Sequence, residues 1–262
     1  MAAAFRVLFT GYAGQRVAST VSFVQDGDIR VIIDPGMVPE PAAILAPLQR
    51  LTDSPDRITD VILSHHHPDH TLSAALFPRA RIHDFWAIYT SDVWQDRAAE
   101  GFALSPSIRL IETPGHTPQD ITTLVATGEG TVAFTHLWWS AQGPVDDPLA
   151  SDPSALHRNR ARVLEVAALI VPGHGAPFKP TAQTPRSSRV PPPGNRLRWH
   201  WGYVQRTCSS RQWWTHAHRF PRPLGISPVV LRSRCPTFHG VRRRVTSDCS
   251  IGVRQGLSAL LP

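Results

Sequence analysis

Histidines and one aspartate are concentrated in the segment Ser64–His70, whose sequence is SHHHPDH. The segment directly follows Thr59–Leu63, a short apolar run that we expect to form a buried strand, so its His-x-His-x-Asp-His pattern lies on the loop at the strand's carboxyl end. Imidazole and carboxylate groups are common ligands of zinc and related metals. Because four potential ligands within six residues are too crowded for one tetrahedral ion, the spacing favours two neighbouring metals.

Two further histidines stand in similar turns downstream. His116 belongs to the sequence ETPGHT and His174 to the sequence VPGHG, and each follows an apolar stretch. Glycine permits a sharp turn and proline fixes its own backbone dihedral, so each imidazole is expected to sit on a stiff turn at a strand end. These two histidines argue against the alternative that the first cluster is a chance His-rich surface tract.

The ordered set of His-x-His-x-Asp-His, Gly-His-Thr and Gly-His motifs resembles the metallo-β-lactamase superfamily. The resemblance runs from about Phe5 to Pro180 and includes Asp34 in the sequence IDPG, which is similar to the family's early Asp-x-Gly turn. The ending Pro172–Phe178 is most similar to the domain-containing protein 1 group of that superfamily. The fold implied by the resemblance is an αββα sandwich of the α+β class.

The resemblance also implies two metal sites with separate ligand sets. The ligands implied for the first site are His65, His67 and His116. The ligands implied for the second site are Asp69, His70 and His174. The implied cofactor is Zn²⁺, as one or two ions, with iron or manganese as alternatives.

Asp69 has a second implied role, which is to orient the nucleophilic hydroxide that forms when a metal lowers the pKa of a water. Asp34 is predicted either to fix the tautomer of a ligand histidine or to serve as a turn residue. His66 is expected to point away from the site. For His83, a structural or rim position is favoured over a ligand role.

The chain departs from the family pattern after the expected strand Thr131–Thr135. Most relatives carry an aspartate there that bridges both metals, whereas this chain continues with His136. His136 is a candidate ligand to one metal, although a neutral imidazole cannot bridge two ions. The alternatives are that Asp146 or Asp147 reaches back to the site, that only one metal binds tightly, or that His136 merely packs beside Trp138.

Hydrophobic periodicity predicts alternating elements over the first 180 residues. The expected strands are Arg6–Thr10, Ser19–Gln25, Ile29–Asp34, Val61–Leu63, Arg81–His83, Ile108–Ile111, Ile121–Ala126 and Thr131–Thr135. The expected helices are Pro41–Leu51, Thr71–Leu76, Phe85–Ala99 and Asp152–Ala168, the last of them with a capping carboxylate and a first-turn proline.

Composition divides the chain near residue 180. Of 27 basic and 20 acidic residues, the segment 181–262 contains 14 Arg and one acid, about +13, which leaves 13 basic and 19 acidic residues in 1–180. The segment also holds all three cysteines and four of the eight tryptophans, without a metal-binding spacing. We expect a hydrolase domain over 1–180 and a basic tail over 181–262 that is disordered or non-native rather than a nucleic-acid-binding segment.

The predicted function is a metal-dependent hydrolase that uses a metal-activated hydroxide on a small ester, thioester or lactone. Leu137–Trp139 suggests an aromatic wall beside the site, and the negative balance of 1–180 disfavours a polyanionic RNA. The alternatives are a phosphodiesterase or endoribonuclease on the same fold and a non-catalytic metal-binding module. The expected partner is a small-molecule substrate. No apolar run is long enough for a membrane span, and a cytoplasmic protein is expected.

Overall fold

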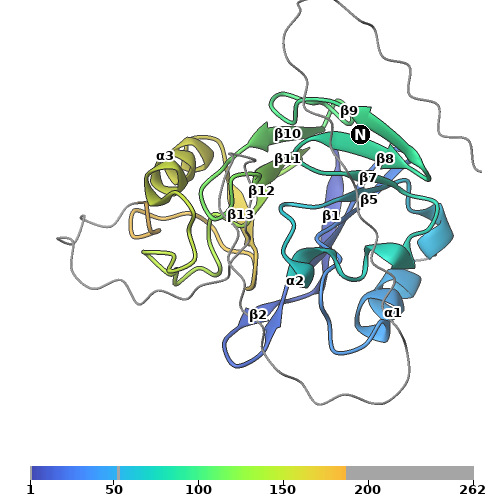
Figure 1. The fold of residues 1–262 in the computed structure, drawn as a ribbon, viewed down its shortest axis with the longest axis horizontal. Helices are drawn as coiled ribbons and strands as arrows, with labels where there is room; N and C mark the ends of the chain where they lie inside the picture. Colours follow the sequence, from blue (N-terminus) through green and yellow to red (C-terminus); the bar gives the residue numbers. More distant parts are fainter. Residues whose placement is uncertain (1, 52–53, 187–262) are drawn as a thin grey trace, which may run out of the picture. The chain divides into compact units, whose positions relative to one another are not determined.

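Two β-sheets dominate the computed structural model of the protein, which describes residues 2–51 and 54–186 (Figure 1). The first sheet has the spatial order β1 (Ala4–Phe9), β4 (Val21–Asp26), β5 (Ile29–Ile33), β6 (Asp60–Ile62), β7 (Arg81–His83), β8 (Ala87–Thr90) and β9 (Val93–Asp96). The second sheet has the order β10 (Ile108–Glu112), β11 (Ile121–Thr127), β12 (Gly130–Thr135) and β13 (Leu169–Pro172). A small hairpin, β2 (Tyr12–Ala13) and β3 (Val17–Ala18), lies apart from both sheets.

The largest core cluster lies between the two sheets. It combines side chains of the first sheet, such as Val31 and Ile62, with side chains of the second, such as Leu110 and Phe134. Alternation of side chains along each strand leaves a second apolar face on the outside of each sheet, which needs its own cover. Helices supply that cover.

Each outer sheet face is covered by one of the two longer helices. Ile44 and Leu48 of α1 (Ala42–Arg50) pack in a cluster with Ile32 of the first sheet. Leu156 and Val163 of α3 (Pro153–Leu164) pack with residues of the second sheet. The layers are therefore helix, sheet, sheet and helix, which confirms the predicted αββα sandwich of the α+β class.

The first turn of α3 is as the sequence predicted. The Asp152 carboxylate accepts a hydrogen bond from the Ala155 backbone N–H at 2.9 Å, and Pro153 occupies the first turn. This carboxylate satisfies a backbone donor that has no partner inside the helix. The helix ends at Leu164, before the predicted Ala168, because Ala168 donates its N–H to Thr131 beside the second sheet.

The predicted helix over Phe85–Ala99 is wrong, since the segment forms the hairpin of β8 and β9. Tyr89 lies opposite Trp94 with ring centroids 4.7 Å apart, and Ser91 adopts a positive φ of 54° in the turn. Aromatic and β-branched residues favour strands, and cross-strand aromatic pairs stabilise them. The predicted helix over Thr71–Leu76 is also replaced by two short helical turns, α2 (Pro68–Thr71) and a 3-10 turn over Ala74–Leu76.

Beyond the predicted domain boundary at residue 180, the described chain continues to Arg186. Thr184 is buried, and the Trp138 indole N–H donates to the Pro185 carbonyl at 2.8 Å. The rest of the predicted basic tail, residues 187–262, lies outside the described residues. Within the part of the chain that the structure describes, no helix combines the length and the apolar character needed to cross a membrane.

Candidate metal centre

Histidines from both sheets meet at one place because each of them directly follows a strand or a strand-end turn. His65 comes after β6, His116 after β10, His136 after β12 and His174 after β13. Strands β12 and β13 are parallel neighbours, so their carboxyl ends lie at the same edge of the second sheet. His136 and His174 are consequently adjacent, with their Nε2 atoms 3.0 Å apart.

A first group of buried imidazoles consists of His65, His116 and His136, whose nitrogen atoms all lie within 4.8 Å of one another. His67 extends this group, because its Nδ1 lies 3.0 Å from Nε2 of His65 and 3.1 Å from Nε2 of His116. Ring nitrogens this close need a shared proton or a common cation between them.

A second group consists of His70, His136 and His174, again with nitrogen atoms within 4.8 Å of one another. The carboxylate of Asp69 lies beside it, with Oδ2 3.5 Å from Nε2 of both His70 and His174. His136 belongs to both groups and therefore lies where they meet.

Asp34 fixes the orientation of His70. Its Oδ2 accepts from Nδ1 of His70 at 2.9 Å, and its Oδ1 accepts from the backbone N–H of Ser64 at 2.7 Å. The opposite ring nitrogen of His70, Nε2, is buried and has no hydrogen-bond partner among the described residues. Gly36 is required in this turn, because a Cβ there would overlap the backbone of Asp69.

Two other histidines, like His70, are oriented by a hydrogen bond from Nδ1 to an oxygen outside the cluster. Nδ1 of His116 donates to Oδ2 of Asp147 at 2.8 Å, and Nδ1 of His174 donates to the Ala18 carbonyl at 2.9 Å. A carbonyl can only accept a hydrogen bond, so the proton of neutral His174 is on Nδ1 and its Nε2 carries a lone pair. Both rings therefore present Nε2 to the cluster, as is usual for metal-binding histidines.

Burial and mutual repulsion lower the pKa of four imidazoles of the cluster. Burial, followed by the nearby histidines, holds the pKa of His65 and His136 well below the ordinary value. The same causes lower the pKa of His67 and His174. A neutral imidazole is the form that binds a metal, so the site is set to accept a cation at neutral pH.

Residues 14–137 match the family model of the metallo-beta-lactamase superfamily. The chain is 32% identical over 192 residues to metallo-beta-lactamase domain-containing protein 1 of Xenopus laevis, a match that covers 66% of this chain and 80% of that protein. The chain belongs to the metallo-β-lactamase superfamily. Members of the superfamily are metal-dependent hydrolases, and the fold and histidine cluster described above are those of a metallo-hydrolase.

Solved structures show the same fold. A putative metallo-beta-lactamase from Thermotoga maritima superposes with a TM-score of 0.56 at 23% identity. The match covers 69% of this chain and 100% of the Thermotoga chain. A second structure, solved in a di-iron-bound form, superposes with a TM-score of 0.50 at 23% identity over 65% of this chain and 94% of its own.

Three residues that the sequence analysis considered for the metal site lie outside the histidine cluster. His66 turns away, with Nε2 3.0 Å from Asp84 Oδ2 and its side chain 35% exposed. His83 is fully buried and bonded through Nε2 to Oδ1 of Asp60 at 2.7 Å. Asp147 contacts His116 from behind, so the structure places it as an outer partner and not between the two histidine groups.

Sequence reasoning did not identify two contacts of this metallo-hydrolase site. The Trp139 indole N–H donates to Oδ2 of Asp147 at 3.1 Å, and the Ala18 carbonyl holds His174. The first pair lies within the irregular segment after β12, and the second joins β3 of the small hairpin to the turn after β13. No motif or periodicity in the sequence marks either pair.

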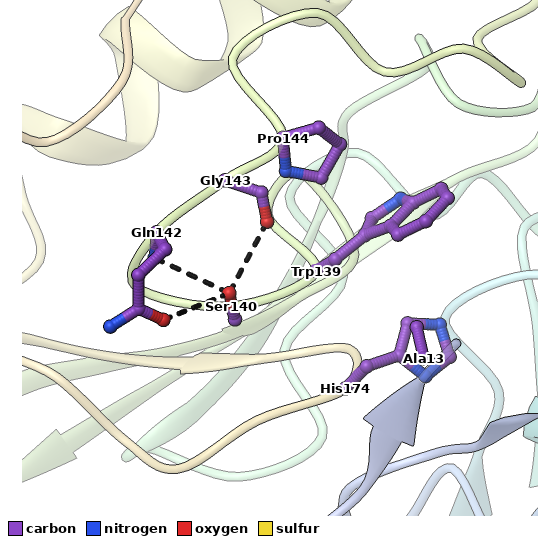
Figure 2. Close-up of a pocket in the computed structure, with 7 residues that line it drawn as sticks. All are labelled: Ala13, Trp139, Ser140, Gln142, Gly143, Pro144 and His174. Carbon is purple, nitrogen blue, oxygen red and sulfur yellow. Dashed lines mark hydrogen bonds between the residues drawn. The ribbon is translucent and has the colours of Figure 1, made fainter. Parts of the chain in front are cut away.

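A pocket of about 300 Å³ opens beside the cluster (Figure 2). Its lining residues are Ala13, Trp139, Ser140, Gln142, Gly143, Pro144 and His174. The rings of Trp139 and His174 lie 6.0 Å apart and border the same side, with Gln142 across from them in Figure 2. None of these lining residues is Lys, Arg, Asp or Glu, and the pKa of His174 is lowered, so the lining carries no formal charge at neutral pH.

Proposed function

We propose that the protein uses zinc, as one or two ions, to hydrolyse a small neutral ester, thioester or lactone. The observation that carries the proposal is the buried Nε2 of His70, which has no hydrogen-bond partner among the described residues and lies within a cluster of imidazole nitrogens. An isolated buried polar atom is costly, and a cation between the nitrogens removes that cost. Iron is the alternative metal, because imidazole also binds iron and because one of the similar solved structures is in a di-iron-bound form.

In this proposal, the ligands of the first site are His65, His67 and His116, and the ligands of the second site are Asp69, His70 and His174. His136 is proposed as a further ligand of the second site, because its Nε2 lies 3.0 Å from that of His174. Asp147 is not proposed as a substitute bridge, since its Oδ2 already accepts from His116 and Trp139.

A bound divalent cation lowers the pKa of a water and polarises the carbonyl oxygen under attack. Asp69 would accept the proton of the attacking water, and the position of its carboxylate beside the second group, with Oδ2 3.5 Å from Nε2 of both His70 and His174, supports this proposal. Asp34 holds His70 and Asp147 holds His116, so these carboxylates keep each ring in the tautomer that presents Nε2 inward.

The pocket supports a neutral acyl substrate. Its Trp139 ring offers a flat apolar wall, and its lining includes the side chains of Ser140 and Gln142 as uncharged hydrogen-bonding groups. Proteins that bind nucleic acids neutralise phosphate groups mainly with Lys or Arg, and no residue that lines the pocket is of either type. A phosphodiesterase activity is therefore the less favoured alternative.

The proposal is tested by metal analysis and turnover of the purified full chain. We expect at least one zinc per chain and hydrolysis of a panel of neutral thioesters and lactones that stops when metal is removed with a chelator and returns when zinc is added. Salt-sensitive cleavage of single-stranded RNA without thioester turnover would instead support the phosphodiesterase alternative. Bound metal with no turnover of either class would indicate a binding module.

A further inference from the structure

Arg160 is a buried arginine on α3 to which the chemistry above assigns no role. Its side chain is 0% exposed, and burial lowers the pKa of its guanidinium to about 10, so it remains charged at neutral pH. Burying a charge is expensive unless hydrogen bonds replace the lost water, and a helix position that faces the core ordinarily holds an apolar residue. The partners of Arg160 therefore indicate what the charge does.

The guanidinium of Arg160 donates to three backbone carbonyls of a single segment, residues 137–147. Nε donates to Leu137 at 2.8 Å, Nη1 to Val145 at 2.6 Å and Nη2 to Pro144 at 2.9 Å. Leu137 begins the segment, whereas Pro144 and Val145 lie near its other end. One planar side chain thus ties both ends of the segment together.

The two ends of this segment adjoin the histidine cluster. His136 directly precedes it, and Asp147, its last residue, accepts from Nδ1 of His116. Trp139 lies within it and donates to the same carboxylate. No named strand or helix occurs within 137–147, all of which the structure describes. Besides the paired backbone bonds between Ser140 and Gly143, its shape depends on bonds from outside, such as those from Arg160. In Figure 1 this yellow-green segment runs between β12 and α3.

We propose that Arg160 is a positioning residue for the metal centre. Its fork of donors fixes the two ends of segment 137–147, so that His136 and Asp147 stay at their places in the cluster and Trp139 stays at the pocket wall. Lysine cannot reproduce this function, because its ammonium is a single point and cannot span three carbonyls in a plane. The inference rests on the proposed function only in so far as His136 and His116 hold a metal.

The test uses Arg160→Met and Arg160→Lys in the full chain, with Arg158→Met as the matched control, because Arg158 is an exposed arginine on the same helix. Two quantities are measured for each variant: amide hydrogen exchange of residues 137–147, and Co²⁺ affinity from a titration followed by the absorption spectrum. We expect Arg160→Met to speed exchange across the segment and to weaken Co²⁺ binding by roughly ten- to a hundred-fold, as loss of an outer partner of a metal ligand does. Arg158→Met should match the wild type in both.

A purely structural role predicts a different result. If Arg160→Met lowers the melting temperature but leaves segment exchange and the Co²⁺ spectrum as in Arg158→Met, the inference is overturned. If Arg160→Met does not fold, Arg160→Lys decides, because it keeps the charge and most of the side-chain volume; unchanged exchange in that variant overturns the inference too. A wild-type chain that binds no Co²⁺ contradicts the proposed function alone, since the exchange comparison still reports on Arg160.

Discussion

His136 occupies the position at which the two histidine groups meet. If its imidazole completes the second site, His136→Ala should lower the zinc content from about two ions toward about one, because the second ion would lose one of its four proposed ligands and bind more weakly. Mass spectrometry of the native protein and metal titration give the stoichiometry directly. A zinc content equal to that of His66→Ala, a variant outside the cluster, would show that His136 is not a ligand.

Asp69 is the residue whose side chain we expect to accept a proton. Asp69→Asn preserves its size and an oxygen donor, so most of the metal should remain bound, whereas turnover should fall by roughly a hundred- to ten-thousand-fold through loss of general-base catalysis. Metal content and kcat are measured on the same preparation. His66→Gln is the control, because it alters the same motif at a residue that turns toward Asp84. Near-normal turnover in Asp69→Asn would remove the proposed role.

The sequence identified the histidines of the cluster because His65, His67 and His70 share one short motif and because the others follow apolar strands. It could not identify their outer partners equally well. Asp34 belongs to a recognisable turn, whereas Asp147 and Ala18 reach His116 and His174 only after the chain has folded. The assignment of the individual ligands stays a prediction, which the variants above test.

At the level of elements, α3 supplies Arg160 and depends on its first turn. Asp152→Ala removes the acceptor of the Ala155 N–H, so the free energy of unfolding should fall by about 1 kcal/mol. Urea denaturation measures the change, and Ser154→Ala, an exposed position in the same turn, serves as the control. An Asp152→Ala variant as stable as the control would show that the cap does not stabilise the helix.

Elements with a capping residue or a clear apolar pattern were predicted well, as α3, β5 and β11 show. The segment of β8 and β9 was not, because its aromatic residues recur at spacings compatible with a helix face as well as with a strand. The pairing of Tyr89 with Trp94 decides in favour of the hairpin, and that pairing is a tertiary outcome.

At the level of the whole molecule, the predicted tail begins at residue 181, but residues 181–186 pack on the domain. We expect a chain ending at Arg186 to keep the melting temperature of the full chain. A chain ending at Pro180 should be less stable, by roughly 1–3 kcal/mol, because the Trp138 indole N–H then loses the Pro185 carbonyl. Thermal unfolding of the three chains distinguishes the boundaries. Equal stability of the two shortened chains would place the boundary at 180.

The metal-free protein should lose stability when the pH falls below about 6.5, the ordinary pKa of histidine. The folded state lowers the pKa of His65 and His136, so below that pH the unfolded chain binds more protons than the folded one. Asp120 acts in the opposite sense, because burial raises its pKa to about 6 and its stabilising contribution is lost as the pH rises through that value. More than one histidine has a lowered pKa, whereas Asp120 is a single group. We therefore expect the free energy of unfolding to fall on acidification.

Urea midpoints of the metal-free protein at pH 7.5 and 5.5 give the measurement. Asp120→Asn should steepen the loss, because it removes the group that offsets the histidines. A midpoint that rises on acidification would contradict the neutral state assigned to the cluster.

The cluster draws His65 and His70 from the side of one sheet and His136 and His174 from the other. A metal held there would cross-link the two sheets. The complete metal site would not exist in a partly folded chain whose sheets have not yet packed together. The metal would therefore be captured late in folding and would slow unfolding rather than speed folding. At a free metal concentration of about 100 times Kd it would add about 2.7 kcal/mol to the stability of the docked state alone.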